Sequence, residues 1–203
     1  MRSLSSNPDF QSAFNRAFDF VKLKHAGQYH ANHLPVWHHL ARVSERLTQL
    51  LELHQEGDSE QRALISLAAL GHDLFEDTDV AEEDVIAVFG PDGYRLIAGM
   101  TNEHGDESIE PYVQKMAQEP EAVRLIKLAD LCDNVTSVTY NLISLGPRWA
   151  REFFLPIVHP MIEMILSAEF TLYARSAQEL KSYLRASYAL LELEYHFFSQ
   201  LEE

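Results

Sequence analysis

Apolar residues recur along most of the chain with the three-to-four-residue spacing of amphipathic helices. Phe10, Phe14 and Phe18 share one face of the first expected helix, and Leu40 and Val43 begin the apolar face of the second. The pattern contains no convincing set of strands, so we predict an all-α fold. The later helices are expected to cover about 61–76, 82–89, 93–100, 110–117, 121–135, 148–170 and 177–198.

Glycine and proline divide these helices. Gly90 and Pro91 separate the two short helices, and the polar segment 101–108 is expected to be a loop. Pro156 and Pro160 are expected to kink or split the helix over 148–170. The helix over 61–76 is the most apolar, which predicts a central position with burial on most sides.

The composition is that of an ordinary globular protein, with 46% hydrophobic and 23% charged residues among 203. A lone cysteine, Cys132, excludes a disulfide framework and is typical of a reducing compartment. Residues 1–10 lack the apolar core of a signal peptide, and no apolar stretch reaches the ~18 residues of a membrane span. We therefore expect a cytoplasmic protein that does not bind membranes.

The net charge of -15 narrows the range of ligands. A strongly acidic surface repels a phosphate backbone, so extended nucleic-acid binding is disfavoured. A small phosphorylated ligand remains compatible with this charge, because a divalent cation and a few local basic groups can reverse the field inside one pocket.

Four ionisable residues interrupt the apolar run near residue 70: His72, Asp73, Glu76 and Asp77. On a continuous helix, His72 lies one turn from Glu76, and Asp73 lies one turn from Asp77. Burying such groups is costly unless they are paired or bind a metal, and a mixture of imidazole and carboxylate ligands suits Mn, Fe, Co, Ni or Zn. An ordinary polar helix end explains the run about equally well, although acids there oppose the helix dipole.

Two further segments carry polar residues at helical spacing. Lys127, Asp130 and Asn134 share one stripe, which by spacing alone is more typical of a solvated face. The segment 35–43 places His38 and His39 at the start of an apolar helix, where a histidine is commonly exposed or capping.

Taken in order, these segments resemble the HD-domain superfamily of metal-dependent phosphohydrolases. Within it, they are similar to the alarmone-hydrolase branch, which comprises the hydrolase half of the RelA/SpoT proteins and their stand-alone small relatives. The resemblance covers about residues 14–138 and is strongest where His72-Asp73 is followed by Glu76-Asp77-Thr78. The matching stretches are 25–28, 35–43, 68–78, 89–90, 99–102 and 127–134.

The resemblance implies a divalent metal, manganese in typical members of the family. Its ligands would be His39, His72, Asp73 and Asp130. His38 competes with His39 by register, and the alignment of Pro35 with the proline of the family selects His39.

The resemblance also implies an activity, the hydrolysis of a nucleotide with release of pyrophosphate from the 3′ position of a guanosine polyphosphate. Glu76 and Asp77 match the acidic pair that positions or activates water. Asn134 matches a residue that contacts the nucleotide, and Lys127 and Thr101 are candidates for the pocket wall.

The chain departs from the alarmone branch where that branch carries an Arg-Lys pair, because these positions are His30 and Ala31. Either the substrate is a different nucleotide, or His30 and His33 replace the pair in substrate binding. Two other functions remain open: an HD-type nucleotidase or phosphomonoesterase, and a non-catalytic module that binds a nucleotide.

The domain organisation follows from the same match. We expect a single HD-type helical bundle over residues 1–146 and a C-terminal helical extension over 147–203. The apolar residues of the extension recur at helical spacing, so the extension is expected to cover the core or to form a homodimer contact.

Overall fold

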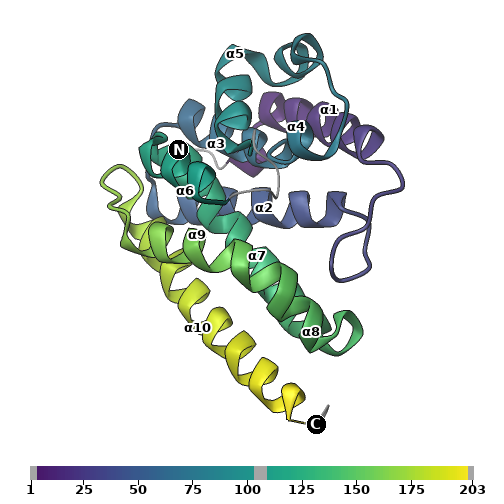
Figure 1. Cartoon of the computed structure of the whole chain (residues 1–203). Helices are drawn as coiled ribbons and strands as arrows, with labels where there is room; N and C mark the ends of the chain where they lie inside the picture. The colour runs from purple at the N-terminus through teal and green to yellow at the C-terminus, as the bar shows by residue number, and fades with distance from the viewer. Residues whose placement is uncertain (1–3, 103–108, 201–203) are drawn as a thin grey trace.

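The computed structural model describes residues 4–102 and 109–200, which are mostly helical and contain no strand (Figure 1). The predicted all-α fold is confirmed. Residues 103–108 of the expected loop lie outside the described residues. The helical elements are η1 (Leu4–Ser6), α1 (Pro8–Lys24), α2 (Trp37–His54), α3 (Ser59–Leu70), α4 (Leu74–Asp77), α5 (Glu82–Met100), α6 (Ile109–Gln118), α7 (Glu121–Leu145), α8 (Pro147–Trp149), η3 (Ala150–Phe154), α9 (Leu155–Ser167) and α10 (Ala174–Ser199).

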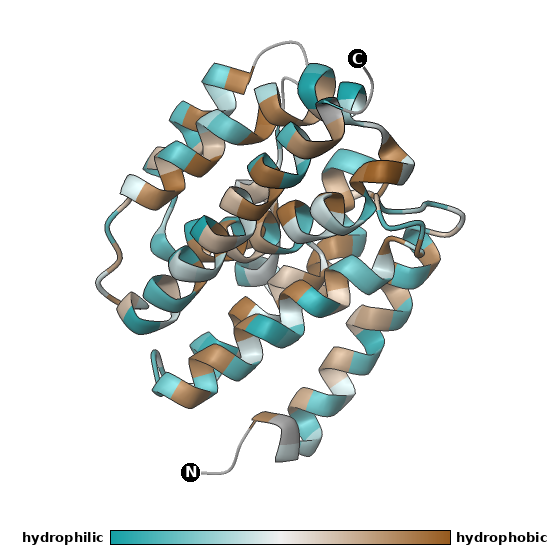
Figure 2. Cartoon of the chain, turned by 90° about the horizontal axis from the view of Figure 1, so that it is seen from below, coloured by the Kyte–Doolittle hydropathy of each residue, from teal (hydrophilic) through white to brown (hydrophobic). Residues whose placement is uncertain are grey.

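Helix α7 is the central element of the fold. It packs against α2 and α5 of the N-terminal part and against α10 of the C-terminal part. Leu125, Leu128 and Val135 on this helix are completely buried. Because α7 is apolar on most sides, any charged group in its middle is desolvated. Figure 2 shows hydrophobic and hydrophilic residues mixed along the surrounding helices, as amphipathic packing requires.

Local signals fix where the helices begin. Asn7 accepts a hydrogen bond from the backbone N–H of Asp9, and Pro8 occupies the first turn of α1. Asp58 and Gln61 form a reciprocal capping box at the start of α3, with N–H to oxygen distances of 2.8 and 3.0 Å. These caps fix the first residues of α1 and α3.

The helix expected over 61–76 is interrupted, and this prediction was wrong. Helix α3 ends at Leu70, and α4 begins only at Leu74. The Nδ1–H of His72 donates to the carbonyl of Ala69 at 2.7 Å, a local bond that competes with the helical hydrogen-bond pattern. His72 and Asp73 therefore lie in a turn, and they are not stacked above Glu76 and Asp77 on one helical face.

Other boundaries depart from expectation by smaller amounts. Gly90 adopts φ 74°, which bends α5 at the predicted break. Helix α7 continues to Leu145, beyond the expected end at 135, because its apolar pattern is maintained by packing against α10. The C-terminal segment is split near Pro156 by the π-helical turn η3, whereas Pro160 is accommodated inside α9.

Helix α10 runs along the outside of the molecule toward the C-terminus (Figure 1). It packs along α7, and its buried residues include Leu180, Leu184 and Leu191. The division into 1–146 and 147–203 stays a prediction. Among the described residues, every helix is too short or too polar to cross a lipid bilayer.

We predict that Gly71→Val destabilises the protein by about 1–3 kcal/mol through overpacking. A Cβ atom at Gly71 would lie 2.7 Å from Cδ1 of Ile97 and 3.0 Å from Cζ of Phe89. Chemical denaturation measures the change. Ala87→Val at an exposed position of α5 is the matched control, and it should cost less than about 1 kcal/mol. Equal losses for both variants would contradict tight packing around Gly71.

Candidate metal centre

Three distant segments bring four predicted ligands together. The first turn of α2 supplies His39, the turn between α3 and α4 supplies His72 and Asp73, and the middle of α7 supplies Asp130. His39, His72 and Asp130 are buried, and Asp73 is half-buried. We call these four residues the ligand cluster.

The donor atoms of the ligand cluster converge on one point. The two Nε2 atoms of His39 and His72 are 3.2 Å apart. Oδ1 of Asp130 lies 3.2 Å from Nε2 of His39 and 3.4 Å from Nε2 of His72. Asp73 approaches the same two atoms at 3.7 and 3.2 Å. Ligands that share an ion at about 2.0–2.2 Å are separated by roughly such distances.

Hydrogen bonds to the other ring nitrogens fix which histidine atoms face this point. Nδ1 of His72 donates to the carbonyl of Ala69, and Nδ1 of His39 donates to the carboxylate of Asp133 at 2.7 Å. Because both partners are acceptors, each neutral ring carries its lone pair on Nε2. His39, His72 and Asp73 thus form a group that can hold a metal ion, and their atoms fit a divalent cation.

The electrostatics of the ligand cluster favour a bound cation. Burial alone would lower the pKa of His39, but hydrogen bonds to Asp130 and Asp133 outweigh it and raise the pKa to about 10. The pKa of His72 is raised in the same way, with burial opposed by Asp73 and Asp130. Burial works to raise the pKa of Asp130, yet Lys127 and the histidines hold it well below its usual range. The carboxylates of this buried space therefore stabilise positive charge at the point where the two histidines meet.

The predicted substrate-binding residues Lys127, Asn134 and His30 surround Asp130. Nζ of Lys127 donates to Oδ2 of Asp130 at 2.9 Å, and Nδ2 of Asn134 donates to Oδ1 at 2.6 Å. Nε2 of His30 lies 2.8 Å from Oδ1 of Asn134. The structure brings all three to the ligand cluster, and their roles in substrate binding stay predictions.

Glu76 and Asp77 lie at the exposed rim of the site, directly after the turn that carries Asp73. The carboxylate of Glu76 accepts the backbone N–H of Asn102 at 2.5 Å, next to Thr101 at the end of α5. Desolvation by the surrounding protein raises the pKa of both acids, and the charge of Asp73 raises both further. A raised pKa makes a carboxylate a stronger base, which suits a group that accepts a proton.

The structure distinguishes between the two candidate histidines, His38 and His39. The ring of His38 stacks on Trp37, with ring centroids 3.6 Å apart, whereas His39 points into the ligand cluster. Sequence reasoning missed Asp133, which contacts His39, and Arg42, which contacts Asp133. The available signal was an acid three residues after Asp130 on the same apolar helix.

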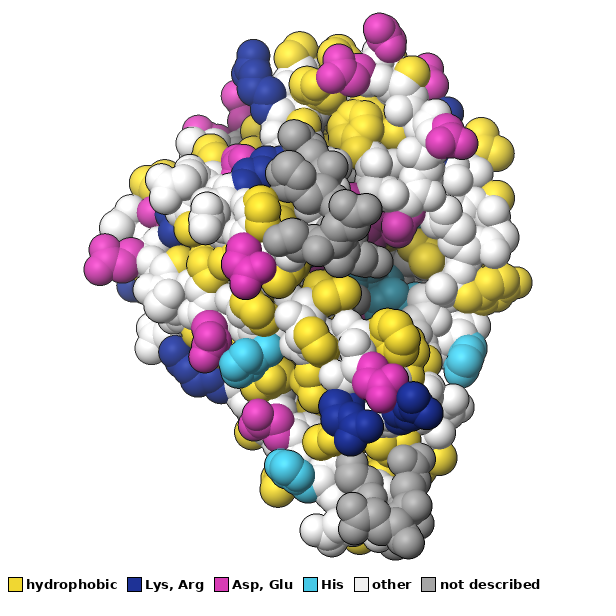
Figure 3. All heavy atoms as spheres, viewed as in Figure 1, with side chains coloured by type: hydrophobic (Ala, Val, Ile, Leu, Met, Phe, Trp, Pro, Cys, Tyr) yellow, Lys and Arg dark blue, Asp and Glu magenta, His cyan; other side chains and the backbone are white. Residues whose placement is uncertain are grey.

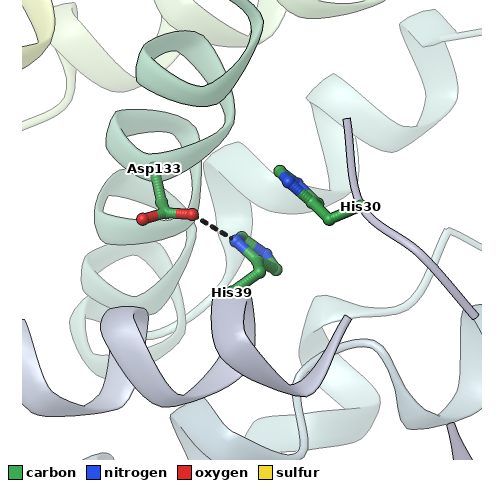
Figure 4. Close-up of side chains that lie close together, drawn as sticks. All are labelled: His30, His39 and Asp133. Atoms are coloured by element: carbon green, nitrogen blue, oxygen red, sulfur yellow. Dashed lines mark hydrogen bonds and ion pairs between the residues drawn. The ribbon is translucent and has the colours of Figure 1, made fainter. Parts of the chain in front are cut away.

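A second group of potential ligands consists of His30, His39 and Asp133 (Figure 4). Arg42 already binds both carboxylate oxygens of Asp133, through Nε and one terminal nitrogen, each at 2.7 Å. A guanidinium in this position repels a cation. The ligand cluster is therefore the better candidate for the metal.

A cavity of about 790 Å³ adjoins the ligand cluster on the other side of Lys127 and Asn134. Figure 3 shows hydrophobic side chains gathered across this face, with a histidine at the bottom of a hollow beside them. The cavity lies between α6, α7 and the C-terminal helices. Its aromatic wall consists of Tyr112, Trp149, Phe153 and Phe154.

The fold and the ligand cluster together define an all-helical protein of the HD class with a candidate metal centre. A solved structure described as a metazoan orthologue of SpoT that hydrolyses ppGpp has the same fold, with a TM-score of 0.67 and 24% identity over 86% of this chain and 95% of that chain. No protein-family model matches the chain.

Two curated relatives identify the family to which the chain belongs. It is 32% identical over 136 residues to the guanosine-3′,5′-bis(diphosphate) 3′-pyrophosphohydrolase MESH1 of Drosophila melanogaster, covering 63% of this chain and 70% of that protein. It is 26% identical over 205 residues to the enzyme of the same name from Aquifex aeolicus, covering 93% of this chain and only 28% of that protein. The chain belongs to the family of guanosine-3′,5′-bis(diphosphate) 3′-pyrophosphohydrolases. The predicted resemblance is confirmed.

We predict that Lys127→Met destabilises the metal-free protein by about 3 kcal/mol, because it leaves Asp130 buried with less compensation. Urea denaturation in a chelator measures the loss. Lys24→Met removes a lysine from the exposed pair with Asp84 and should cost less than about 1 kcal/mol. Near-equal costs would show that Asp130 does not depend on Lys127.

Proposed function

We propose that this chain is a metal-dependent guanosine-3′,5′-bis(diphosphate) 3′-pyrophosphohydrolase. The observation that carries the proposal is the convergence of donor atoms from His39, His72, Asp73 and Asp130 on one buried point. Membership of the family supports this reaction, because it is the reaction for which these relatives are named.

We propose that the ligand cluster binds manganese. Its mixed imidazole and carboxylate donors suit this ion, and they also suit Fe, Co, Ni and Zn. When bound, such an ion supplies Lewis acidity, which makes water a better nucleophile and neutralises charge on phosphate oxygens. The two histidines and two aspartates would hold it.

Glu76 and Asp77 are the proposed proton acceptors. They lie at the open side of the ligand cluster, and desolvation by the surrounding protein raises their pKa values. In the reaction, a water oxygen bonds to the phosphorus attached to the 3′ oxygen, and the bond between that phosphorus and the 3′ oxygen breaks. Pyrophosphate is released, and the 3′ oxygen takes up a proton and becomes the 3′ hydroxyl of the nucleoside 5′-diphosphate. A carboxylate at the rim takes the proton that the water loses.

The cavity beside the ligand cluster is the proposed site of the nucleoside. Its volume of about 790 Å³ lies within the range typical of small-molecule sites. Aromatic side chains such as Trp149 and Phe153 offer flat apolar surfaces against which a base can stack. These two residues come from the segment 147–203, so the C-terminal extension forms part of the proposed substrate site as well as covering the core.

The test is pyrophosphate and phosphate release from a nucleotide panel with added Mn²⁺, for the wild type and Asp73→Ala. Pyrophosphate from guanosine 3′,5′-polyphosphates, lost in Asp73→Ala, is expected. Asp84→Ala at an exposed position is the control and should retain activity. Orthophosphate from nucleoside monophosphates alone would replace the proposal by a nucleotidase, and no release from any substrate would refute hydrolysis.

We predict that Glu76→Gln lowers kcat by about 10²–10⁴-fold, because the amide cannot accept a proton from water. The affinity for Mn²⁺ should remain within a few-fold of the wild type, since Glu76 is not in the ligand cluster. Steady-state kinetics and metal titration measure the two quantities separately. Glu83→Gln in the exposed first turn of α5 is the matched control. Full activity of Glu76→Gln would show that a group other than Glu76 accepts the proton.

A further inference from the structure

A hydrogen bond holds the Nδ1 side of the His39 ring, which faces away from the ligand cluster. Its Nδ1 atom lies 2.7 Å from Oδ2 of Asp133, in the view of Figure 4. Asp133 projects from α7 one turn after Asp130, so one helix contacts both ring nitrogens of His39. Asp130 meets Nε2 of His39, and Asp133 meets Nδ1.

Asp133 is itself fixed by Arg42. The guanidinium donates from Nε to Oδ1 and from a terminal nitrogen to Oδ2, both at 2.7 Å. This bidentate pairing sets the plane of the carboxylate, and thereby the line along which His39 can donate. Arg42 and His39 are three residues apart on α2, so the chain Arg42–Asp133–His39 links α2 to α7 and back.

A second contact restricts the rotation of His39. The ring of His30 stacks on the ring of His39, with centroids 4.5 Å apart and planes 8° apart. Nε2 of His30 is bonded to Asn134, which anchors it to α7. The imidazole of His39 is therefore held in its own plane by Asp133 and across that plane by His30.

We propose that Asp133, oriented by Arg42, is a positioning residue that keeps the proton of His39 on Nδ1 and presents Nε2 as a metal ligand. A carboxylate behind a metal-binding histidine fixes its tautomer and raises its strength as a ligand. The proposal rests on the proposed function only in taking His39 as a ligand of the metal. Asp133 does not touch the metal or the substrate, and it acts through His39.

The test is the affinity of the full chain for Mn²⁺, measured by competition with a chelating indicator without any substrate. Asp133→Asn should weaken binding by about 10–100-fold, because the amide gives a weaker acceptor and breaks the pairing with Arg42. Ser137→Ala, a buried polar position one turn further along α7, is the matched control and should bind as the wild type does. Asp133→Glu, which retains the carboxylate, should recover part of the loss.

A second measurement keeps the proposal testable if Asp133→Asn does not fold. In the wild type loaded with Zn²⁺, nitrogen-resolved NMR of the histidine rings should show His39 bound to metal through Nε2 and protonated on Nδ1. Coordination through Nδ1 would overturn the proposal, as would unchanged affinity in a folded Asp133→Asn. If the wild type binds no metal, both the metal centre and the role of Asp133 are overturned. If metal binds tightly and the affinity is the same in a folded Asp133→Asn variant, only the role of Asp133 is overturned.

Discussion

The structure depends on the burial of two carboxylates on a helix that is otherwise surrounded by apolar side chains. Asp130 and Asp133 lie on the buried side of α7, where desolvation of an unpaired charge costs several kcal/mol. Lys127 pairs with one carboxylate and Arg42 with the other. Asp73 adds a third negative charge beside them, and the two histidines direct their Nε2 atoms toward the same point. A divalent cation bound there would replace the protons on the Nε2 atoms and balance the carboxylates.

This constraint explains features of the fold that are remote from the chemistry. Helix α7 must be central because it carries Asp130 and Asp133 toward α2, while its opposite side packs against α10. The turn at Gly71 must interrupt the apolar helix because it directs His72 and Asp73 to the same point. The C-terminal helices then close the side of α7 that remains, and in doing so they form the aromatic wall of the cavity. In a chain with a net charge of -15, a divalent cation bound here would make this the place that attracts a phosphorylated ligand.

Much of this arrangement could be predicted from the sequence, and the remainder has physical reasons for being hidden. Helical spacing predicted the all-α fold, and the kink at Gly90 followed from a glycine beside a proline. The resemblance to the HD superfamily predicted the four members of the ligand cluster, which the structure brings together. The break after Leu70 could not be predicted from periodicity, because the bond from His72 to Ala69 is local and leaves the apolar pattern intact. The pairing of Arg42 with Asp133 joins residues 91 positions apart, so the spacing of Asp133 from Asp130 gave no indication of its partner.

The central claim is that the ligand cluster is a metal centre, and anomalous X-ray diffraction from crystals grown with Mn²⁺ tests it most directly. The account predicts one anomalous peak per chain, bounded by Nε2 of His39, Nε2 of His72 and the carboxylates of Asp73 and Asp130, at about 2.0–2.2 Å from the donor atoms. An anomalous peak between His30 and Asp133, or no anomalous peak anywhere on the chain, would contradict it.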